Sequence, residues 1–189
     1  MYDKLEAFLR ERQARYRVVD LGGAVTAQEQ AAAVSASGWT VAKVLIVKER
    51  DGFVMAVVPA CCVLDMNRLK GLIGHGEIRL ATVEEARAAV PDCPPGAIPP
   101  FGALFHLRTF VDRALLNTRE ITMPAGDFTT GMRMRAGEFR RVAEPRVGDF
   151  AVRESLLTAK GAWLSPRSSR RRAGAGVAGS ARLAGKRPR

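Results

Sequence analysis

One ten-residue stretch combines residue types that can do chemistry through the main chain. It reads Cys93-Pro94-Pro95-Gly96-Ala97-Ile98-Pro99-Pro100-Phe101-Gly102. Its four prolines and two glycines exclude a helix interior or a central strand, because proline fixes φ and lacks a backbone donor while glycine opens positive φ. A loop shaped in this way can hold N–H and C=O groups in fixed directions. The stretch is either a site that works with main-chain groups or a rigid connector, and composition alone favours neither.

Conventional catalytic side chains are sparse. Cys93 precedes the loop, but no histidine lies near it in the sequence, which argues against a thiol nucleophile. The three cysteines form no C-x-x-C pair, so we interpret them as reduced thiols in a cytoplasmic protein. The two histidines, His75 and His106, have no acids clustered around them. We therefore expect no metal and no organic cofactor.

The positive charge is concentrated at the C-terminal end of the chain. The 189 residues carry a net charge of +11, yet residues 1–152 hold 20 basic and 18 acidic residues. Residues 153–189 hold ten basic residues and one acid, and are mostly Ser, Arg, Gly, Ala, Pro and Lys from residue 165. Such a segment cannot bury enough apolar surface to offset its ordering entropy. We expect one domain over 1–152 and a disordered tail over 153–189, which either attracts RNA phosphates non-specifically or has no role.

Targeting and membrane signals are not visible in the sequence. Residues 1–13 alternate charged and apolar positions, unlike a signal peptide. The longest apolar run, Phe53 to Leu64, is interrupted by Pro59 and is too short to span a bilayer. We therefore expect no membrane partner.

The elements that must position the loop follow from periodicity and capping signals. Thr26 with Glu29 and Thr82 with Glu85 form capping boxes, and Asp51-Gly52 is a hairpin signal. Helices are predicted at residues 2–13, 27–36, 66–73, 82–90 and 136–143. Strands are predicted at residues 16–21, 41–47, 53–58, 77–81, 104–107, 110–112, 120–123 and 131–134. Because strands come both in neighbouring pairs and between helices, we predict a mixed α/β (α+β) domain with a largely antiparallel sheet surrounded by helices.

An ordered set of motifs links these elements. In chain order they are Thr26-x-x-Glu29, Val41-Ala42-Lys43-Val44-Leu45-Ile46-Val47, Phe53-x-x-Ala56-Val57-Val58-Pro59, Leu80-Ala81-Thr82-x-Glu84-Glu85, Pro95-Gly96-x-x-Pro99-Pro100-Phe101-Gly102, Val111-Asp112 and Ala125-Gly126. Each is weak alone, but the order is specific. It resembles the YbaK / prolyl-tRNA synthetase editing-domain family, the freestanding aminoacyl-tRNA deacylases, over roughly residues 3–152.

The resemblance implies hydrolysis of the ester between a wrong amino acid and the 3′ end of a tRNA. Such clearance is needed because one methylene group discriminates by only about 1–3 kcal/mol in a binding pocket. The implied partner is an aminoacylated tRNA and, in addition, an aminoacyl-tRNA synthetase.

The resemblance also implies roles for individual residues. Lys43 would bind the 3′-terminal phosphate or ribose of the tRNA, although a strand lysine facing solvent is the alternative. The backbone of the Gly96–Pro100 segment would hold the substrate carbonyl, the attacking water or the amino-acid ammonium. Ala97, Ile98 and Pro99 belong to this catalytic segment.

A second segment is implied to form part of the amino-acid pocket. The residues carried over to substrate binding are Phe101, Gly102, Ala125, Gly126 and Gly131, together with Lys43. This chain departs from the family at Pro124, where Asn is frequent, and near Gly131, where Met132 and Arg133 stand in place of an acid. Thr129, Thr130 and Arg133 are equally well explained as turn and strand residues.

Two other functions remain open. The departures at residues 124 and 132–133 are compatible with a non-catalytic module that binds an aminoacyl end or a synthetase. An RNA-associated protein driven by its basic tail is the second alternative, and deletion of residues 153–189 separates it from the editing function. The amino acid, the tRNA and the oligomeric state do not follow from the sequence.

Overall fold

The computed structural model describes residues 1–74 and 76–153. The predicted C-terminal tail lies outside the described residues except for Arg153, which ends the last strand. Within the described residues, no helix is long and apolar enough to cross a membrane.

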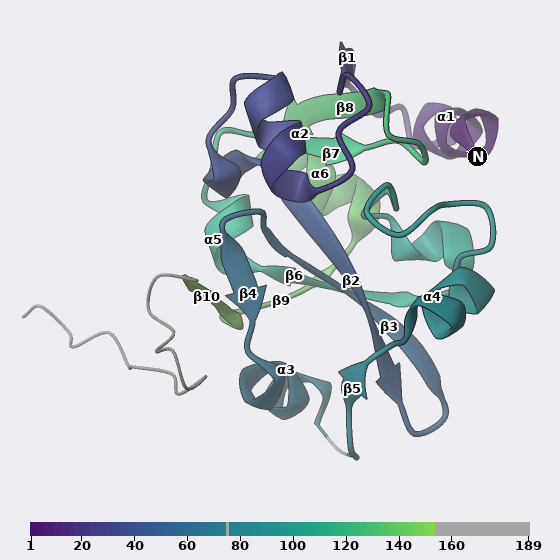
Figure 1. Ribbon diagram of the computed structural model, residues 1–189, viewed down its shortest axis with the longest axis vertical. Coiled ribbons are helices and arrows are strands. Elements are labelled where there is room, and N and C mark those ends of the chain that lie inside the picture. The colour runs from purple at the N-terminus through teal and green to yellow at the C-terminus, as the bar shows by residue number, and fades with distance from the viewer. Residues whose placement is uncertain (75, 154–189) are drawn as a thin grey trace, which may run out of the picture.

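A five-stranded sheet forms the centre of the molecule (Figure 1). Its strands, in spatial order, are β5 (Arg79–Leu80), β2 (Ala42–Glu49), β3 (Gly52–Pro59), β6 (Arg108–Asp112) and β9 (Arg146–Gly148). Strand β2 runs antiparallel to both neighbours, whereas β3–β6 and β6–β9 are parallel pairs. The predicted Asp-Gly hairpin is confirmed, since Glu49 pairs with Gly52.

Two smaller sheets flank the central one, and both are antiparallel. The three-stranded sheet has the order β1 (Arg17–Asp20), β8 (Thr130–Arg135), β7 (Glu120–Pro124). The two-stranded sheet joins β10 (Ala151–Arg153) to β4 (Cys62–Leu64). A single parallel bridge between Val41 and Thr122 ties the three-stranded sheet to the start of β2.

Helices cover both faces of the central sheet. They are α1 (Tyr2–Glu11), α2 (Ala27–Ala33), α3 (Met66–Ile73), α4 (Val83–Ala89), α5 (Arg113–Leu116) and α6 (Ala136–Ala143), with short 3-10 turns at Gly38–Thr40 and Gly102–Phe105. Both predicted capping boxes form, at Thr26 before α2 and at Thr82 before α4. Each threonine hydroxyl accepts from the N–H three residues on, so it satisfies a donor that the helix itself leaves unpaired.

The core has two layers because β3 is buried on both faces. Met55 and Val57 pack into the larger cluster with α1, α6 and the loop that follows α4. Val54, Ala56 and Val58 pack into a second cluster against α3 and Phe150. A strand covered on both faces is a continuous apolar run, as the sequence of β3 is.

The predicted fold class, a mixed and largely antiparallel sheet surrounded by helices, is confirmed. The strand predicted over residues 104–107 is wrong. There the chain forms a 3-10 turn and then reverses at His106, whose φ is 56°. The Leu107 N–H donates to the Gly102 carbonyl, and the Gly102 N–H donates to the Thr109 hydroxyl, which closes the turn.

Candidate functional site

A cavity of about 460 Å³ lies along the edge of β2. Strand β5 pairs with β2 only at Val47 and Lys48, so the preceding part of this edge is left to the cavity. The remaining walls come from the start of α2, the start of α4 and the loop after α4, through Thr26, Thr82 and Gly96. We call it the Lys43 cavity.

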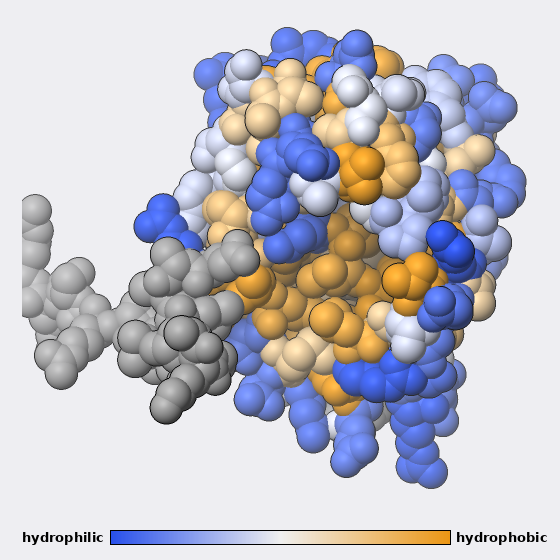
Figure 2. Space-filling model, in the orientation of Figure 1, coloured by the Kyte–Doolittle hydropathy of each residue, from blue (hydrophilic) through white to orange (hydrophobic). Residues whose placement is uncertain are grey.

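The surface of the Lys43 cavity is mainly apolar. Three of its residues, Val25, Leu80 and Val83, are about half exposed, which is unusual for large hydrophobic side chains in this molecule. Figure 2 shows an apolar surface in the middle of the face on which β2 runs, bordered by hydrophilic residues. No acid, histidine or cysteine lines the cavity among the described residues. A mainly apolar ligand with one anionic end matches this wall, because Lys43 is the one cationic side chain among its described lining residues.

Lys43 lies early in β2 and is half-buried. Its Nζ donates to the backbone carbonyl of Cys62, at the start of β4. This bond fixes the direction of the Lys43 ammonium at the wall of the cavity.

Gly96 brings the loop after α4 against the loop before α2. Its φ is +95°, and a Cβ on this residue would lie 2.6 Å from the Val25 carbonyl oxygen. Only glycine fits there, since other residues are strained at this φ and the opposing atom belongs to the backbone. Gln30 of α2, 1% exposed, donates from Nε2 to the carbonyls of Gly96 at 3.0 Å and Ala24 at 3.3 Å. The buried amide therefore holds both loops together.

Some N–H and C=O groups of the loop make hydrogen bonds within the protein, and others do not. The Ala97 N–H donates to the Pro94 carbonyl, and the Ala97 carbonyl accepts from the Gly126 N–H at 3.0 Å. Pro99 and Pro100 have no N–H. The N–H groups of Gly96 and Ile98 donate no hydrogen bond within the described part of the chain. Both residues line the Lys43 cavity, so two donors of the loop stay available beside it.

The structure brings together some of the predicted site residues and separates others. Lys43, Gly96 and Ile98 share the cavity, whereas Ala97, Pro99 and Pro100 are buried behind it. Phe101 is fully buried between the rings of Phe8 and Phe139, at centroid distances of 5.7 and 5.6 Å.

At the glycines predicted for the amino-acid pocket, close packing leaves no room for a side chain. A Cβ on Gly102 would lie 2.4 Å from the Thr109 hydroxyl, and one on Gly131 would lie 2.8 Å from Leu21. Gly126 has φ +110° and follows the buried Ala125. None of these residues lines the Lys43 cavity. Gly102 follows the loop directly in the chain, and the Gly126 N–H donates to the Ala97 carbonyl within it.

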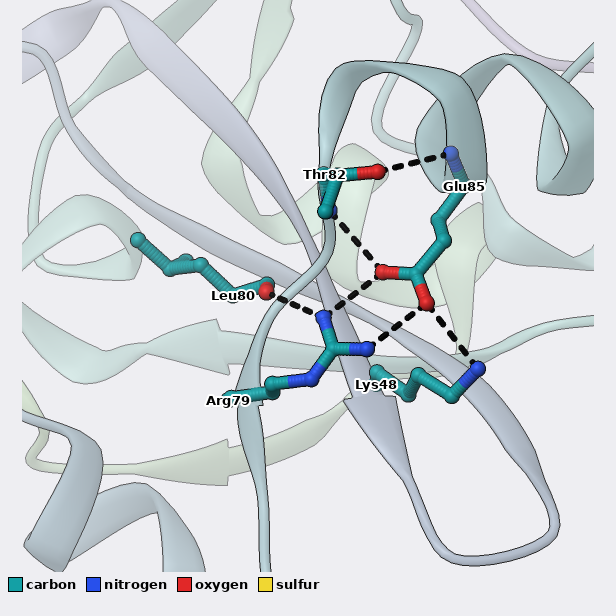
Figure 3. Close-up of polar contacts among 5 residues, drawn as sticks. All are labelled: Lys48, Arg79, Leu80, Thr82 and Glu85. Carbon is teal, nitrogen blue, oxygen red and sulfur yellow. Dashed lines mark hydrogen bonds and ion pairs between the residues drawn. The ribbon is translucent and has the colours of Figure 1, made fainter.

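A hydrogen-bonded cluster fixes the rim at the start of α4 (Figure 3). The Glu85 carboxylate accepts from both terminal nitrogens of Arg79, at 2.7 Å each, and from Lys48 at 3.0 Å. It also accepts from the backbone N–H of Thr82, which lines the cavity. These hydrogen bonds hold the pKa of Glu85 far below its ordinary value; the bond from Arg79 has the largest effect, then the backbone of Thr82, then Lys48.

The other titratable candidates lie apart from this cavity. Burial raises the pKa of the Cys93 thiol to about 11, so it is protonated at neutral pH and is a poor nucleophile. Asp112, 3% exposed, accepts from the backbone N–H groups of Ala114, Phe150 and Ala151, which accounts for it structurally. In the part of the chain that the structure covers, no group of three or more His, Cys, Asp or Glu residues could hold a metal ion.

The residues at which the chain departs from the family also lie outside the cavity. Pro124 ends β7, and Arg133 of β8 donates from Nε to the Thr122 hydroxyl at 3.0 Å. Sequence reasoning missed Gln30, although a signal existed. On α2 it shares a face with Ala27 and Ala31, and a glutamine among buried alanines indicates a buried hydrogen bond.

Comparisons with known proteins agree with this geometry. The family described as "Aminoacyl-tRNA editing domain" matches residues 22–142. A crystal structure of the hypothetical protein APE2540 is 25% identical, with a TM-score of 0.73, and the match covers 79% of this chain and 99% of that one. A protein proposed as a trans-editing enzyme for prolyl tRNA synthetase is 27% identical, with a TM-score of 0.71 and coverage of 80% and 96%. No protein among the curated sequences matches.

The match spans more than half of the chain, so this protein belongs to the aminoacyl-tRNA editing domain family. The resemblance predicted from the ordered motifs is thereby confirmed. Its function is the editing of mischarged tRNA by deacylation.

Proposed function

We propose that the protein is a carboxylic ester hydrolase that works in the Lys43 cavity. It cleaves the ester between a wrongly attached amino acid and the terminal ribose of a tRNA. The observation that carries this proposal is the meeting of Lys43 with the two unused N–H groups of Gly96 and Ile98 on one mainly apolar wall. A cation for the anionic RNA end and two fixed donors for a carbonyl oxygen are the parts that ester hydrolysis requires.

The reaction adds water to the ester carbonyl carbon. The carbonyl oxygen becomes an oxyanion, which the N–H groups of Gly96 and Ile98 stabilise. When the C–O bond to the ribose breaks, the ribose oxygen takes the proton that the attacking water has given up and leaves as a hydroxyl, and the amino acid departs as its acid. A main-chain donor of this type contributes roughly a factor of 10²–10³ in rate. Because no acid, histidine or cysteine lines the cavity among the described residues, the proposal assigns catalysis to positioning and main-chain electrostatics.

Lys43 binds the 3′-terminal phosphate or ribose of the tRNA. Its bond to the Cys62 carbonyl fixes the ammonium at the cavity wall, and the positive charge attracts the anionic end of the RNA. Ala97, Pro99 and Pro100 shape the loop behind the wall. Phe101, Gly102, Ala125, Gly126 and Gly131 act as positioning residues, since their packing and the Gly126–Ala97 bond support the loop from below.

The partners follow from this chemistry. The substrate is the aminoacylated 3′ end of a tRNA, recognised by phosphate, stacking and 2′-OH contacts. A synthetase that produces the mischarged tRNA is a further proposed partner, and the proposed location is the cytoplasm.

A deacylation panel tests the proposal. Purified protein is assayed against tRNAs that carry Ala, Cys, Ser, Thr or Pro, beside the variants Lys43→Ala and Lys70→Ala. Loss of a charge-assisted contact of about 1.5–3 kcal/mol lowers kcat/KM roughly 10- to 150-fold for Lys43→Ala. Lys70, exposed on α3 and outside the cavity, is the matched control and keeps wild-type kcat/KM.

The panel also separates the enzyme from a binding module. Hydrolysis of one or two esters that depends on Lys43 supports the proposal. If the protein binds tRNA but hydrolyses no ester, the proposal is overturned and the non-catalytic binding module remains. That alternative is supported by the described cavity wall, which has no side chain that could act as a base.

A further inference from the structure

A second cavity, of about 670 Å³, lies at the far end of the three-stranded sheet. Its walls are the first residue of β1, the first of β7, the last of β8 and the start of α6. Five arginines line it: Arg15, Arg17, Arg119, Arg133 and Arg135. We call it the arginine cavity.

The two acids of the arginine cavity are already neutralised. Glu120 pairs with Arg17 at 3.0 Å, and Glu138 pairs with Arg141 of α6 at 2.8 Å. The side chains of Arg119 and Arg135 make no hydrogen bond or ion pair within residues 1–74 and 76–153, and both are exposed. Residues 1–152 carry a net charge of only +2, so this local excess of positive charge is concentrated rather than general.

The arginine cavity lies at one end of the three-stranded sheet, and the loop behind the Lys43 cavity is bonded to the segment that follows β7 at the other end. Glu120 pairs with Arg135 in the arginine cavity, and Pro124 pairs with Gly131 at the other end. From there Gly126 bonds to Ala97 in the loop behind the Lys43 cavity. The five residues of β7 span about 17 Å at the usual rise per residue. Several successive nucleotides of an RNA strand can cover such a distance.

We propose that the arginine cavity binds the phosphodiester backbone of the tRNA whose 3′ end occupies the Lys43 cavity. This inference rests on the proposed function. Guanidinium forks match phosphate oxygens bidentately, and unpaired exposed arginines lose no internal partner when they bind. Tyr16 lines the same wall and is half-buried, and basic walls that contain an aromatic residue are typical of single-stranded RNA sites.

The start of α6 adds to the positive electrostatic potential of the arginine cavity. The Ala136 N–H donates to the Arg119 carbonyl, but Arg135 at the N-cap makes no side-chain cap bond, so the positive end of the helix dipole faces the cavity without a capping acid. An acidic protein segment would fit the same charge, but the aromatic face and the continuity with a tRNA-end site favour RNA.

Binding of uncharged tRNA to the full chain tests the inference without reference to hydrolysis. The double variant Arg119→Ala/Arg135→Ala is compared with Arg50→Ala/Arg140→Ala, which removes two exposed arginines that lie outside the cavity. Fluorescence anisotropy is measured between 50 and roughly 200 mM salt, the range over which counterion release is strong. For two lost phosphate contacts, the slope of log K against log salt becomes shallower by about 1.4–1.8 in the cavity variant only.

A second assay distinguishes failure of this inference from failure of the proposed function. With mischarged tRNA, the cavity variant raises KM about tenfold and keeps kcat, and with an aminoacyl-adenosine ester both constants stay at wild-type values. Equal weakening by both double variants overturns the inference, as does loss of synthetase binding with unchanged tRNA binding. If no ester is hydrolysed at all, the proposed function fails, and the anisotropy result still decides the inference.

Discussion

The two cavities are built from different parts of the chain. The Lys43 cavity combines an apolar wall with main-chain donors of a glycine-proline loop, and one lysine supplies its charge. The arginine cavity consists mainly of long charged side chains that project from strand ends. The first cavity thus presents rigid backbone groups, and the second presents flexible cationic side chains.

This difference separates the two tasks that editing requires. Main-chain donors keep their positions because the loop is fixed by Gln30, Gly96 and two prolines, which suits stabilisation of a transition state. Arginine side chains adapt to a backbone that is the same in every tRNA, which suits binding. Truncation of side chains should therefore affect tRNA binding at the arginine cavity, whereas the chemistry should fail when the backbone of the loop is altered.

The largest expected effect is that of Gly96→Ala. The new Cβ would meet the Val25 carbonyl at 2.6 Å, and φ of +95° strains any other residue, so the loop must move. Displacement of its two donors lowers kcat by about 100-fold or more. Affinity for uncharged tRNA, measured by anisotropy, stays within about twofold because the arginine cavity is untouched.

Gly71→Ala is the matched control for this substitution. Gly71 lies within α3, and a Cβ there would meet nothing within 4 Å. Alanine should stabilise the helix by about 0.5–1 kcal/mol, with kcat unchanged. Wild-type kcat in Gly96→Ala would contradict the assignment of the chemistry to this loop.

Much of this loop could be predicted from the sequence. Gly96 and its neighbours stand out because proline and glycine restrict the local backbone, and both capping boxes rest on contacts three residues apart. Lys43 was identified through the resemblance to a family. These signals could be read from the sequence because each depends on residues that are close together in the chain.

The rest depends on contacts between distant parts of the chain. Gln30 and Gly96 are 66 residues apart, and Gly126 and Ala97 belong to two loops that are separate in the chain. The arginines at residues 15, 119 and 135 gather only after β1, β7 and β8 pair, so no spacing in the sequence indicates them. The pattern of residues 104–107 predicts a strand. The chain turns there instead, because the Thr109 hydroxyl accepts from the Gly102 N–H, a contact that the local pattern does not contain.

A smaller effect is expected for Gln30→Leu. The variant removes the two hydrogen bonds from Gln30 to the carbonyls of Gly96 and Ala24, and at roughly 0.5–1.5 kcal/mol each this lowers folding stability by about 1–3 kcal/mol. Because the loop loses its clamp, kcat falls about tenfold while KM for tRNA is kept. Thermal unfolding and steady-state kinetics measure the two effects separately.

Gln28→Leu is the matched control for stability, because Gln28 is exposed on the same helix. If both variants lost the same stability, the hydrogen bonds that Gln30 makes could not be the cause of the loss. Loss of stability in Gln30→Leu with wild-type kcat would show that the loop holds its donors without this clamp, and would weaken the contrast between a rigid and a flexible cavity.

The smallest effect concerns the rim cluster and its pH dependence. Arg79, Thr82 and Lys48 lower the pKa of Glu85 below its ordinary value of 4.5, so the ionised carboxylate stabilises the folded state. That contribution is fully present above pH 4.5 and is lost as the pH falls toward the lowered pKa. Glu85→Gln should therefore have a lower Tm than wild type at pH 7, and the gap should narrow as the pH is lowered below 4.5.

Glu77→Gln separates this cluster from general acid unfolding. Glu77 is exposed and makes no ion pair within the described residues. Its Tm curve from pH 7 to about pH 3 should follow wild type. A gap between Glu85→Gln and wild type that persists unchanged in acid would mean that the charge of Glu85 does not hold the rim. The apolar packing of α4 alone would then fix that wall of the Lys43 cavity, and the contrast with the charged cavity would be sharper still.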